Sequence, residues 1–179
     1  MKKLILIFFI FLAGCSTAIK DYESGYGVES TYDEFEKTTR TALHSNVLDG
    51  GHATLSSVQA SAMNIIQYKK PDTTIYQLQY IYVADEWLFI GEDNSLSLLV
   101  DGEKYDFSAY DNFRETIDYM GGVKIREYVY YPVSKDMLEK IANAKIVKVK
   151  VSGRQYYVQS QFNKSNFKNF KKFLAQHGK

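Results

Sequence analysis

The chain has 179 residues, of which 45% are hydrophobic and 24% are charged, and its formal net charge is +1. This length predicts one domain, and the balance of apolar and charged residues excludes long disorder, a collagen-like chain and a protein with several membrane spans. The single cysteine excludes a disulfide framework within the monomer. The near-neutral charge favours no nucleic-acid partner.

The first residues have the pattern of an export signal. Lys2 and Lys3 precede an unbroken apolar run over residues 4–13. Ten helical residues rise about 15 Å, which is half the hydrocarbon core of a bilayer, so the run is too short for a permanent span and indicates a cleavable signal. The run leads into four residues, Leu12, Ala13, Gly14 and Cys15.

These four residues resemble the lipobox of the bacterial lipoprotein family at every position. The resemblance implies that signal peptidase II cleaves before Cys15 and that Cys15 is acylated on sulfur and on its new amino group, with chains such as palmitate. The family retains lipoproteins with Asp after the cysteine in the inner membrane. Ser16 follows here, which favours the periplasmic face of the outer membrane. Two or three acyl chains anchor stably, so the lipid bilayer is one expected partner.

The rest of the chain reads as a tether and one folded unit. Residues 16–27 are polar without an apolar rhythm, and such a segment has a flexible reach of about 20 Å. We therefore expect residues 1–14 to be a signal peptide, residues 15–27 to be the lipidated cysteine and tether, and residues 28–179 to form a single α+β domain.

The first half of this domain reads as strands. They are expected over residues 38–47, 53–68, 73–83, 87–90 and 95–100, with a hairpin turn at residues 49–51 between the first two. Asp101-Gly102 is the strongest hairpin signal, because a type I′ turn needs positive φ at both positions. A turn there pairs Leu98 with Tyr105 and Leu96 with Phe107.

The second half adds two helices. Residues 123–131 predict a strand closed by Pro132, and Ser134 can cap a helix over residues 135–143. Residues 147–151 and 155–161 predict a hairpin whose turn at Ser152-Gly153 pairs Val149 with Tyr156 and Val147 with Val158. A last helix over residues 164–176 has aromatic residues on one side and lysines on the other. The expected fold is α+β, with an antiparallel sheet, curved or doubled into a sandwich, covered in part by two helices.

The sequence offers no motif for catalysis or metal binding. The three histidines are His44, His52 and His177, and the expected hairpin does not bring His44 opposite His52. No serine lies in a nucleophile motif, and no glycine-rich phosphate loop occurs. We therefore expect neither a cofactor nor a metal. A carboxylate pair formed only in space stays open, because sequence spacing does not define it.

Two stretches contain residue types common in binding sites. Residues 109–122 include Tyr110, Phe113, Arg114 and Tyr119, which are types found at binding hot spots. The alternative is a surface loop, or a short helix through Phe113 and Ile117 that packs onto the domain. The second stretch is an aromatic strand face with a neighbouring tryptophan, formed by Tyr76, Tyr80, Tyr82 and Trp87. It can line a groove for glycan or peptide, or pack in the core.

Charge is unevenly distributed along the mature chain. Residues 15–134 contain 9 basic and 19 acidic side chains, whereas residues 135–179 contain 11 basic and 2 acidic ones. A basic surface is expected from six lysines, Lys148, Lys150, Lys164, Lys168, Lys171 and Lys172. It would suit anionic lipid, anionic glycan or an acidic protein. Alternatively, the basic segment packs beside the acidic one with each lysine solvated.

The first hypothesis is therefore a non-enzymatic, membrane-anchored lipoprotein that faces the periplasm and binds a protein partner or an anionic envelope polymer. The second is an envelope hydrolase that acts on peptidoglycan or glycan through carboxylates brought together in space. The third, by analogy alone, is an accessory subunit of a secretion or assembly machine.

Overall fold

The computed structural model describes residues 25–53 and 58–178. The signal sequence, Cys15 and most of the expected tether lie outside these residues. In chain order the elements are β1 (Gly27–Asp33), β2 (Thr38–His44), β3 (Asp49–Ala53), β4 (Val58–Lys69), β5 (Thr74–Ala84), β6 (Leu96–Val100), β7 (Glu103–Phe107), β8 (Asp111–Tyr119), β9 (Gly122–Val133), α1 (Lys135–Asn143), β10 (Val147–Ser152), β11 (Tyr157–Gln161) and α2 (Lys164–His177).

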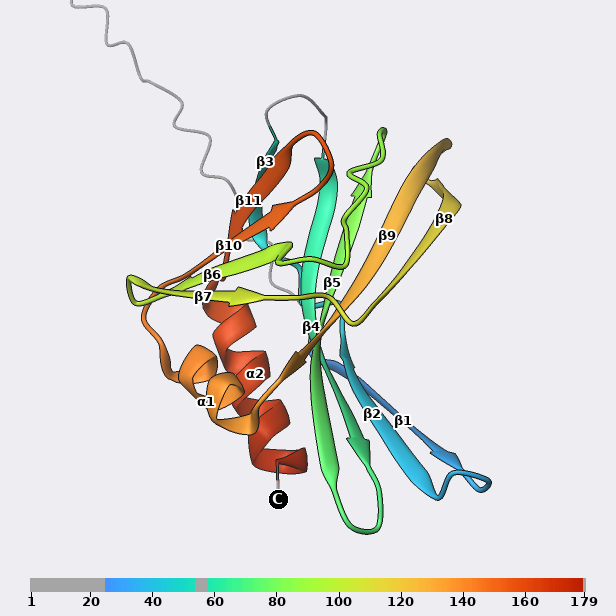
Figure 1. The fold of residues 1–179 in the computed structure, drawn as a ribbon, viewed down its shortest axis with the longest axis vertical. Coiled ribbons are helices and arrows are strands. Elements are labelled where there is room, and N and C mark those ends of the chain that lie inside the picture. Colours follow the sequence, from blue (N-terminus) through green and yellow to red (C-terminus); the bar gives the residue numbers. More distant parts are fainter. Residues whose placement is uncertain (1–24, 54–57, 179) are drawn as a thin grey trace, which may run out of the picture.

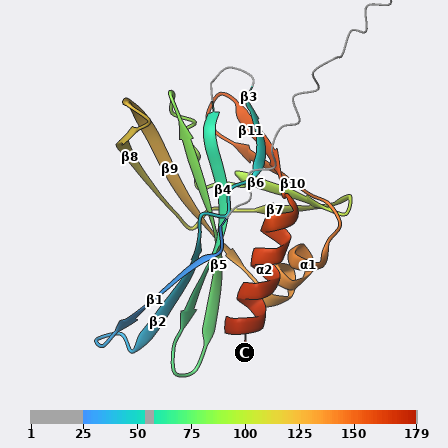
Figure 2. The same cartoon turned by 180° about the vertical axis from the view of Figure 1, so that it is seen from behind.

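These strands form two antiparallel sheets. The larger has six strands in the order β1-β2-β4-β5-β9-β8, and the smaller has five in the order β3-β11-β10-β6-β7. The larger sheet is strongly curled, and both helices lie on the same side of it as the smaller sheet (Figure 1). Figure 2 shows the same layering from behind, with α2 beside the lower half of the larger sheet. The expected α+β fold is thus confirmed.

The core lies between the two sheets and the helices. Alternating residues of β5, including Leu78 and Tyr80, face inward and are fully buried. Val149 of β10 meets them from the smaller sheet, and Phe170 and Phe173 of α2 close the core from the side. The tyrosine-rich face of β5 is therefore packing surface, because period-two alternation directs it toward the helices and the second sheet.

Local signals predicted several elements correctly. Asp101 and Gly102 have φ values of 50° and 91°, and the register pairs Leu98 with Tyr105 as expected. The side chain of Ser134 caps α1 by accepting a hydrogen bond from N of Met137. Strand β9 continues through Pro132 to Val133 rather than ending before it.

The expected hairpin at residues 49–51 is wrong. β2 and β4 do pair antiparallel, but Asp49–Ala53 forms β3 and pairs with β11 in the other sheet. A β-bulge lies between Gln159 and Ser160 opposite Gly50, whose φ is +86°. Gly50 thus lies in an irregular edge strand and not in a tight turn.

Residues 109–122 were expected as a loop or a short helix and instead contain β8, the edge strand of the larger sheet. Strand β8 pairs with β9 along its whole length, from Asp111 opposite Tyr130 to Tyr119 opposite Gly122. Long-range pairing decides this conformation, because the polar–aromatic sequence has no strong local preference.

A chain of buried amides ties α2 to the larger sheet. Nδ2 of Asn169 donates to Oδ1 of Asn46 (3.1 Å), and N of Asn46 donates to Oδ1 of Asn64 (3.1 Å). Nδ2 of Asn64 then donates to Oε1 of Gln79 (3.0 Å). Buried polar groups that are satisfied in this way favour one packing arrangement of α2.

The described fold begins before the expected boundary at Val28. The hydroxyl of Tyr26 donates to Oε1 of Gln176 at 2.6 Å, and Gly27 already belongs to β1. In the part of the chain that the structure describes, no helix is both long and apolar enough to cross a membrane.

Candidate functional site

The segment between β5 and β6 is held by one buried carboxylate. Glu127 lies on the inward face of β9, and its side chain is only 1% exposed. Its Oε1 accepts hydrogen bonds from N of Leu88 (2.6 Å) and of Phe89 (2.8 Å), and its Oε2 accepts from N of Ile90 (3.0 Å). Nε of Arg114 donates to Oε2 at 3.1 Å. The carboxylate therefore orients three successive backbone N–H groups and balances its charge with Arg114.

This arrangement explains why residues 87–90 do not form the expected strand. Phe89 has a φ of 54°, a region that residues other than glycine rarely adopt. The conformation points three successive N–H groups at one carboxylate, which a pleated strand cannot do because its N–H groups alternate in direction. Phe89 itself is 43% exposed beside this buried charge.

The turn between β10 and β11 packs onto the same segment. N of Arg154 donates to O of Leu88 (3.1 Å), and N of Gly153 donates to O of Tyr156 (2.9 Å). A Cβ on Gly153 would lie 1.9 Å from O of Leu88, so only glycine fits there.

This longer turn makes the expected register wrong. Val149 pairs with Ser160 rather than with Tyr156, and Val151 pairs with Val158. The docked turn occupies residues 153–156, between the end of β10 and the start of β11.

A pocket of about 380 Å³ lies where these two segments meet. We call it the Phe89 pocket, and it is lined by Phe89, Gly91, Asp93, Asn94, Ser95, Arg114, Ser152, Gly153 and Arg154. Two guanidinium groups contact the Phe89 ring: Cζ of Arg114 lies 5.8 Å from the ring centroid and Cζ of Arg154 lies 5.4 Å from it. Cation–π contacts of this length hold both side chains beside the ring.

The two arginines differ in how their charges are balanced. Arg114 bonds Glu127 through Nε and O of Ile90 through Nη2 (2.7 Å), so its position is set by the fold. Arg154 is exposed and forms no ion pair with any residue in 25–53 or 58–178. Its donors are available to a ligand that carries an oxyanion.

One predicted binding residue lines this pocket, and a second lies beside one of its lining residues. Arg114 lines it, and the ring of Trp87 lies 6.2 Å from that of Phe89 between centroids. Tyr80 is fully buried in the core, where burial raises the pKa of its hydroxyl. Tyr80 therefore belongs to the packing alternative rather than to a ligand-binding surface.

The other predicted aromatic residues lie elsewhere. Phe113 and Tyr119 occupy alternate positions of β8 to Arg114, so they lie on the opposite face of the sheet. The Phe113 ring packs on Tyr128 with centroids 6.0 Å apart. Tyr110 is highly exposed in the connection before β8. The strand thus separates the residues that the linear sequence grouped together.

The predicted lysines divide into two groups. Lys148 and Lys150 lie on the outer face of the smaller sheet, where they line a pocket of about 590 Å³ together with Lys104. Lys168 and Lys172 are exposed on α2. No hydrogen bond or ion pair among the described residues joins one group to the other.

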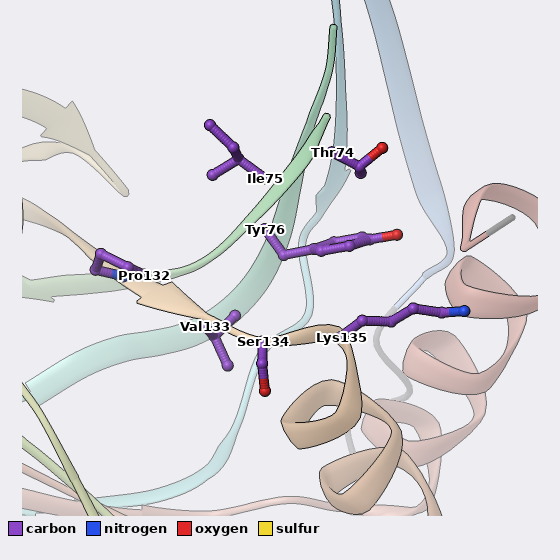
Figure 3. A pocket seen from close by; sticks show the side chains of 7 residues that line it. All are labelled: Thr74, Ile75, Tyr76, Pro132, Val133, Ser134 and Lys135. Atoms are coloured by element: carbon purple, nitrogen blue, oxygen red, sulfur yellow. The ribbon is translucent and has the colours of Figure 1, made fainter. Parts of the chain in front are cut away.

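A shallow pocket of about 450 Å³ lies where the start of β5 and the end of β9 meet α1. Figure 3 shows the Tyr76 hydroxyl and the Lys135 amine extending toward α2, whereas the Ser134 hydroxyl points away from them. Ser134 caps α1, and the Tyr76 hydroxyl accepts from Nε2 of Gln67 (3.2 Å). The polar groups do not converge on one point, so this pocket offers no reactive centre.

Sequence reasoning missed Glu127, Phe89 and Arg154. One signal existed for Glu127: it shares the period-two face of β9 with Ile125 and Val129, where a charge is unexpected. Phe89 and Arg154 had no local signal, because their proximity depends on the docking of two loops 65 positions apart in the chain.

In the described part of the chain, no cluster of three or more His, Cys, Asp or Glu side chains has a geometry for a metal ion. Comparison of this chain with protein-family models, with curated proteins and with solved structures finds no match.

Proposed function

We propose that this chain is a lipid-anchored, non-enzymatic binding protein on the periplasmic face of the bacterial outer membrane. The anchor rests on the lipobox ending at Cys15. The Phe89 pocket binds a carboxylate of a peptide or protein partner. The observation that carries this proposal is Arg154, an exposed guanidinium that stands beside an exposed Phe89 ring without an ion pair among the described residues.

The chemistry of the pocket matches a peptide carboxylate. A guanidinium presents paired N–H donors that fit the two oxygens of a carboxylate. The Phe89 ring, with Trp87 next to it, offers apolar area for a neighbouring side chain of the ligand. The Asp93 carboxylate lines the same pocket and can accept from a peptide N–H. Arginine and aromatic side chains are also the commonest binding hot spots.

The fold prepares this pocket before a ligand arrives. Glu127 holds the backbone of residues 88–90 through three hydrogen bonds, and the Gly153 turn packs against the same segment. A preformed site loses less conformational entropy on binding. Glu127 and the Gly153 turn therefore support binding by fixing the backbone of the pocket, and neither needs to contact the ligand.

Isothermal titration calorimetry on the mature lipidated chain in detergent tests the proposal. The probes are N-acetylalanyl-leucine, which has a free carboxylate, and its carboxamide. We expect a dissociation constant of about 1 mM for the acid and binding about tenfold weaker for the amide, the loss of one charge-assisted interaction at an exposed site. Arg154→Gln should abolish this preference.

Arg126→Gln is the matched control, because Arg126 pairs with Glu115 at 3.5 Å on the opposite face of the larger sheet. That variant should keep the preference for the acid. Equal binding of acid and amide by the unmodified protein would refute the proposal. Competition by inorganic phosphate as strong as by the acid would contradict the assignment to a peptide.

A further inference from the structure

Helix α2 presents a predominantly basic face to solvent. Four lysines and an alanine recur at helical spacing on the side away from the core, namely Lys164, Lys168, Lys171, Lys172 and Ala175, and all five are exposed. The buried Phe170 and Phe173 lie on the opposite side. The helix contains no acidic residue.

Within the described residues, the lysines of this face have no acidic partner. None of the four forms an ion pair with a residue of 25–53 or 58–178. Nζ of Lys172 lies 3.9 Å from the centroid of the Tyr26 ring, which carries no charge that could balance it. A face with four unmatched positive charges favours an anionic surface as its partner.

The chain enters the described fold beside this same helix. O of Gly25 accepts a hydrogen bond from Nδ2 of Asn169 at 3.4 Å, and the hydroxyl of Tyr26 donates to Gln176. The Tyr26 ring lies under Lys172. The segment that leads back to Cys15 therefore joins the domain at the flank of the lysine face.

The length of that segment keeps the lysine face near the anchor. Ten residue steps separate Cys15 from Gly25. A chain of that length spans at most about 36 Å in any conformation. An acylated Cys15 would hold the flank of α2 within this distance of the bilayer surface.

We propose that the lysine face of α2 docks on the anionic lipid head groups of the membrane in which Cys15 is anchored. This inference rests on the lipid anchor of the proposed function. Figures 1 and 2 place the β10–β11 turn at the end of the molecule away from the C-terminus of α2. The β10–β11 turn, whose Gly153 and Arg154 line the Phe89 pocket, therefore lies away from the C-terminal end of the docked helix.

The test measures access to the lysine face in the lipidated protein. Ala175→Cys places a thiol among the lysines, and its alkylation by a membrane-impermeant maleimide is timed. The lipidated chain is reconstituted in vesicles of phosphatidylcholine alone or of an equimolar mixture with phosphatidylglycerol. Each lysine near an anionic surface multiplies the docked population by about five, so alkylation should be more than about tenfold slower in the mixture.

Two variants, each with four lysines replaced, distinguish docking through α2 from docking through the smaller sheet. Replacing Lys164, Lys168, Lys171 and Lys172 with Gln should restore fast alkylation in the anionic vesicles. The matched control replaces four lysines on and beside the smaller sheet with Gln, namely Lys104, Lys145, Lys148 and Lys150, and should leave alkylation slow. Salt at about 1 M, where the screening length is about 3 Å, should also restore the fast rate.

Each alternative result overturns the inference. Equal rates in the two kinds of vesicle, from a chain that mass spectrometry shows to be acylated, would refute the docking of α2 and leave the anchor intact. A chain without acyl groups at Cys15 would refute both the anchor and the docking. Slow alkylation that only the control variant reverses would assign the lipid contact to the smaller sheet.

Discussion

Replacing Glu127 with Gln tests whether one buried carboxylate holds the pocket together. The glutamine side chain has nearly the same shape, but its amide nitrogen cannot accept a hydrogen bond. Glu127 accepts four hydrogen bonds, two at each oxygen. In either amide orientation, two donors of the protein would face an NH₂ group.

The magnitude follows from these two lost interactions. Hydrogen bonds to a charged group contribute about 1.5–3 kcal/mol each, and breaking a buried ion pair by removing one partner costs about 3–5 kcal/mol. The Arg114 side chain is 33% exposed, so solvent replaces part of its loss. We expect Glu127→Gln to lower the free energy of unfolding by about 3 kcal/mol and the melting temperature by about 6–12 °C.

Urea and thermal denaturation followed by circular dichroism measure this effect. Glu115→Gln is the control, because Glu115 makes a half-exposed pair with Arg126 at 3.5 Å. That pair contributes less than about 1 kcal/mol. If Glu127→Gln proved no less stable than Glu115→Gln, the claim that the carboxylate organises residues 88–90 would fail.

Three further changes test other parts of the fold. Gly153→Ala would place a Cβ 1.9 Å from a backbone oxygen, and should lower the stability of the fold by about 1–3 kcal/mol in thermal melts. Gly91→Ala is the control, because its Cβ would meet no atom within 4 Å and the change should be tolerated. Burial raises the pKa of Tyr80 and of Tyr131 above the ordinary 10.0, so both stay protonated in the fold while the same residues of the unfolded chain ionise. The free energy of unfolding in urea should therefore fall as pH rises past about 10, and a free energy that stayed constant there would contradict this reasoning. Asn46→Ala removes a buried donor to O of Met63 (2.8 Å) and an acceptor for Asn169, and should cost about 2–3 kcal/mol in urea unfolding.

Local sequence patterns predicted the elements whose conformation is set by neighbouring residues. Asp101-Gly102 predicted both a turn and a register, because positive φ at two adjacent positions admits few alternatives. The period of Phe170 and Phe173 against the lysines predicted α2. The expected turn at residues 49–51 failed because β3 pairs with a strand about 110 positions later in the chain, which no local window reveals.

The candidate site likewise combines residues that local patterns could select with contacts that only the folded chain creates. Arg114 and Trp87 could be selected by residue type, but nothing local joined them to Arg154. Their proximity depends on two long-range contacts: Glu127 binds the backbone N–H of Phe89, and the Gly153 turn packs against Leu88. The prediction of Tyr80 as a binding residue was wrong. It lies on the face of β5 that packs against the smaller sheet and the helices, so its side chain is buried.

The arginine side-chain resonances of the isotope-labelled, lipidated protein test the central claim most directly. Titration with N-acetylalanyl-leucine should shift the Nε–Hε signal of Arg154, because the carboxylate binds beside that group in the Phe89 pocket. The signal of Arg126, on the opposite face, should stay in place. No movement of the Arg154 signal up to saturating acid, or an equal movement with the carboxamide, would contradict carboxylate binding at this pocket.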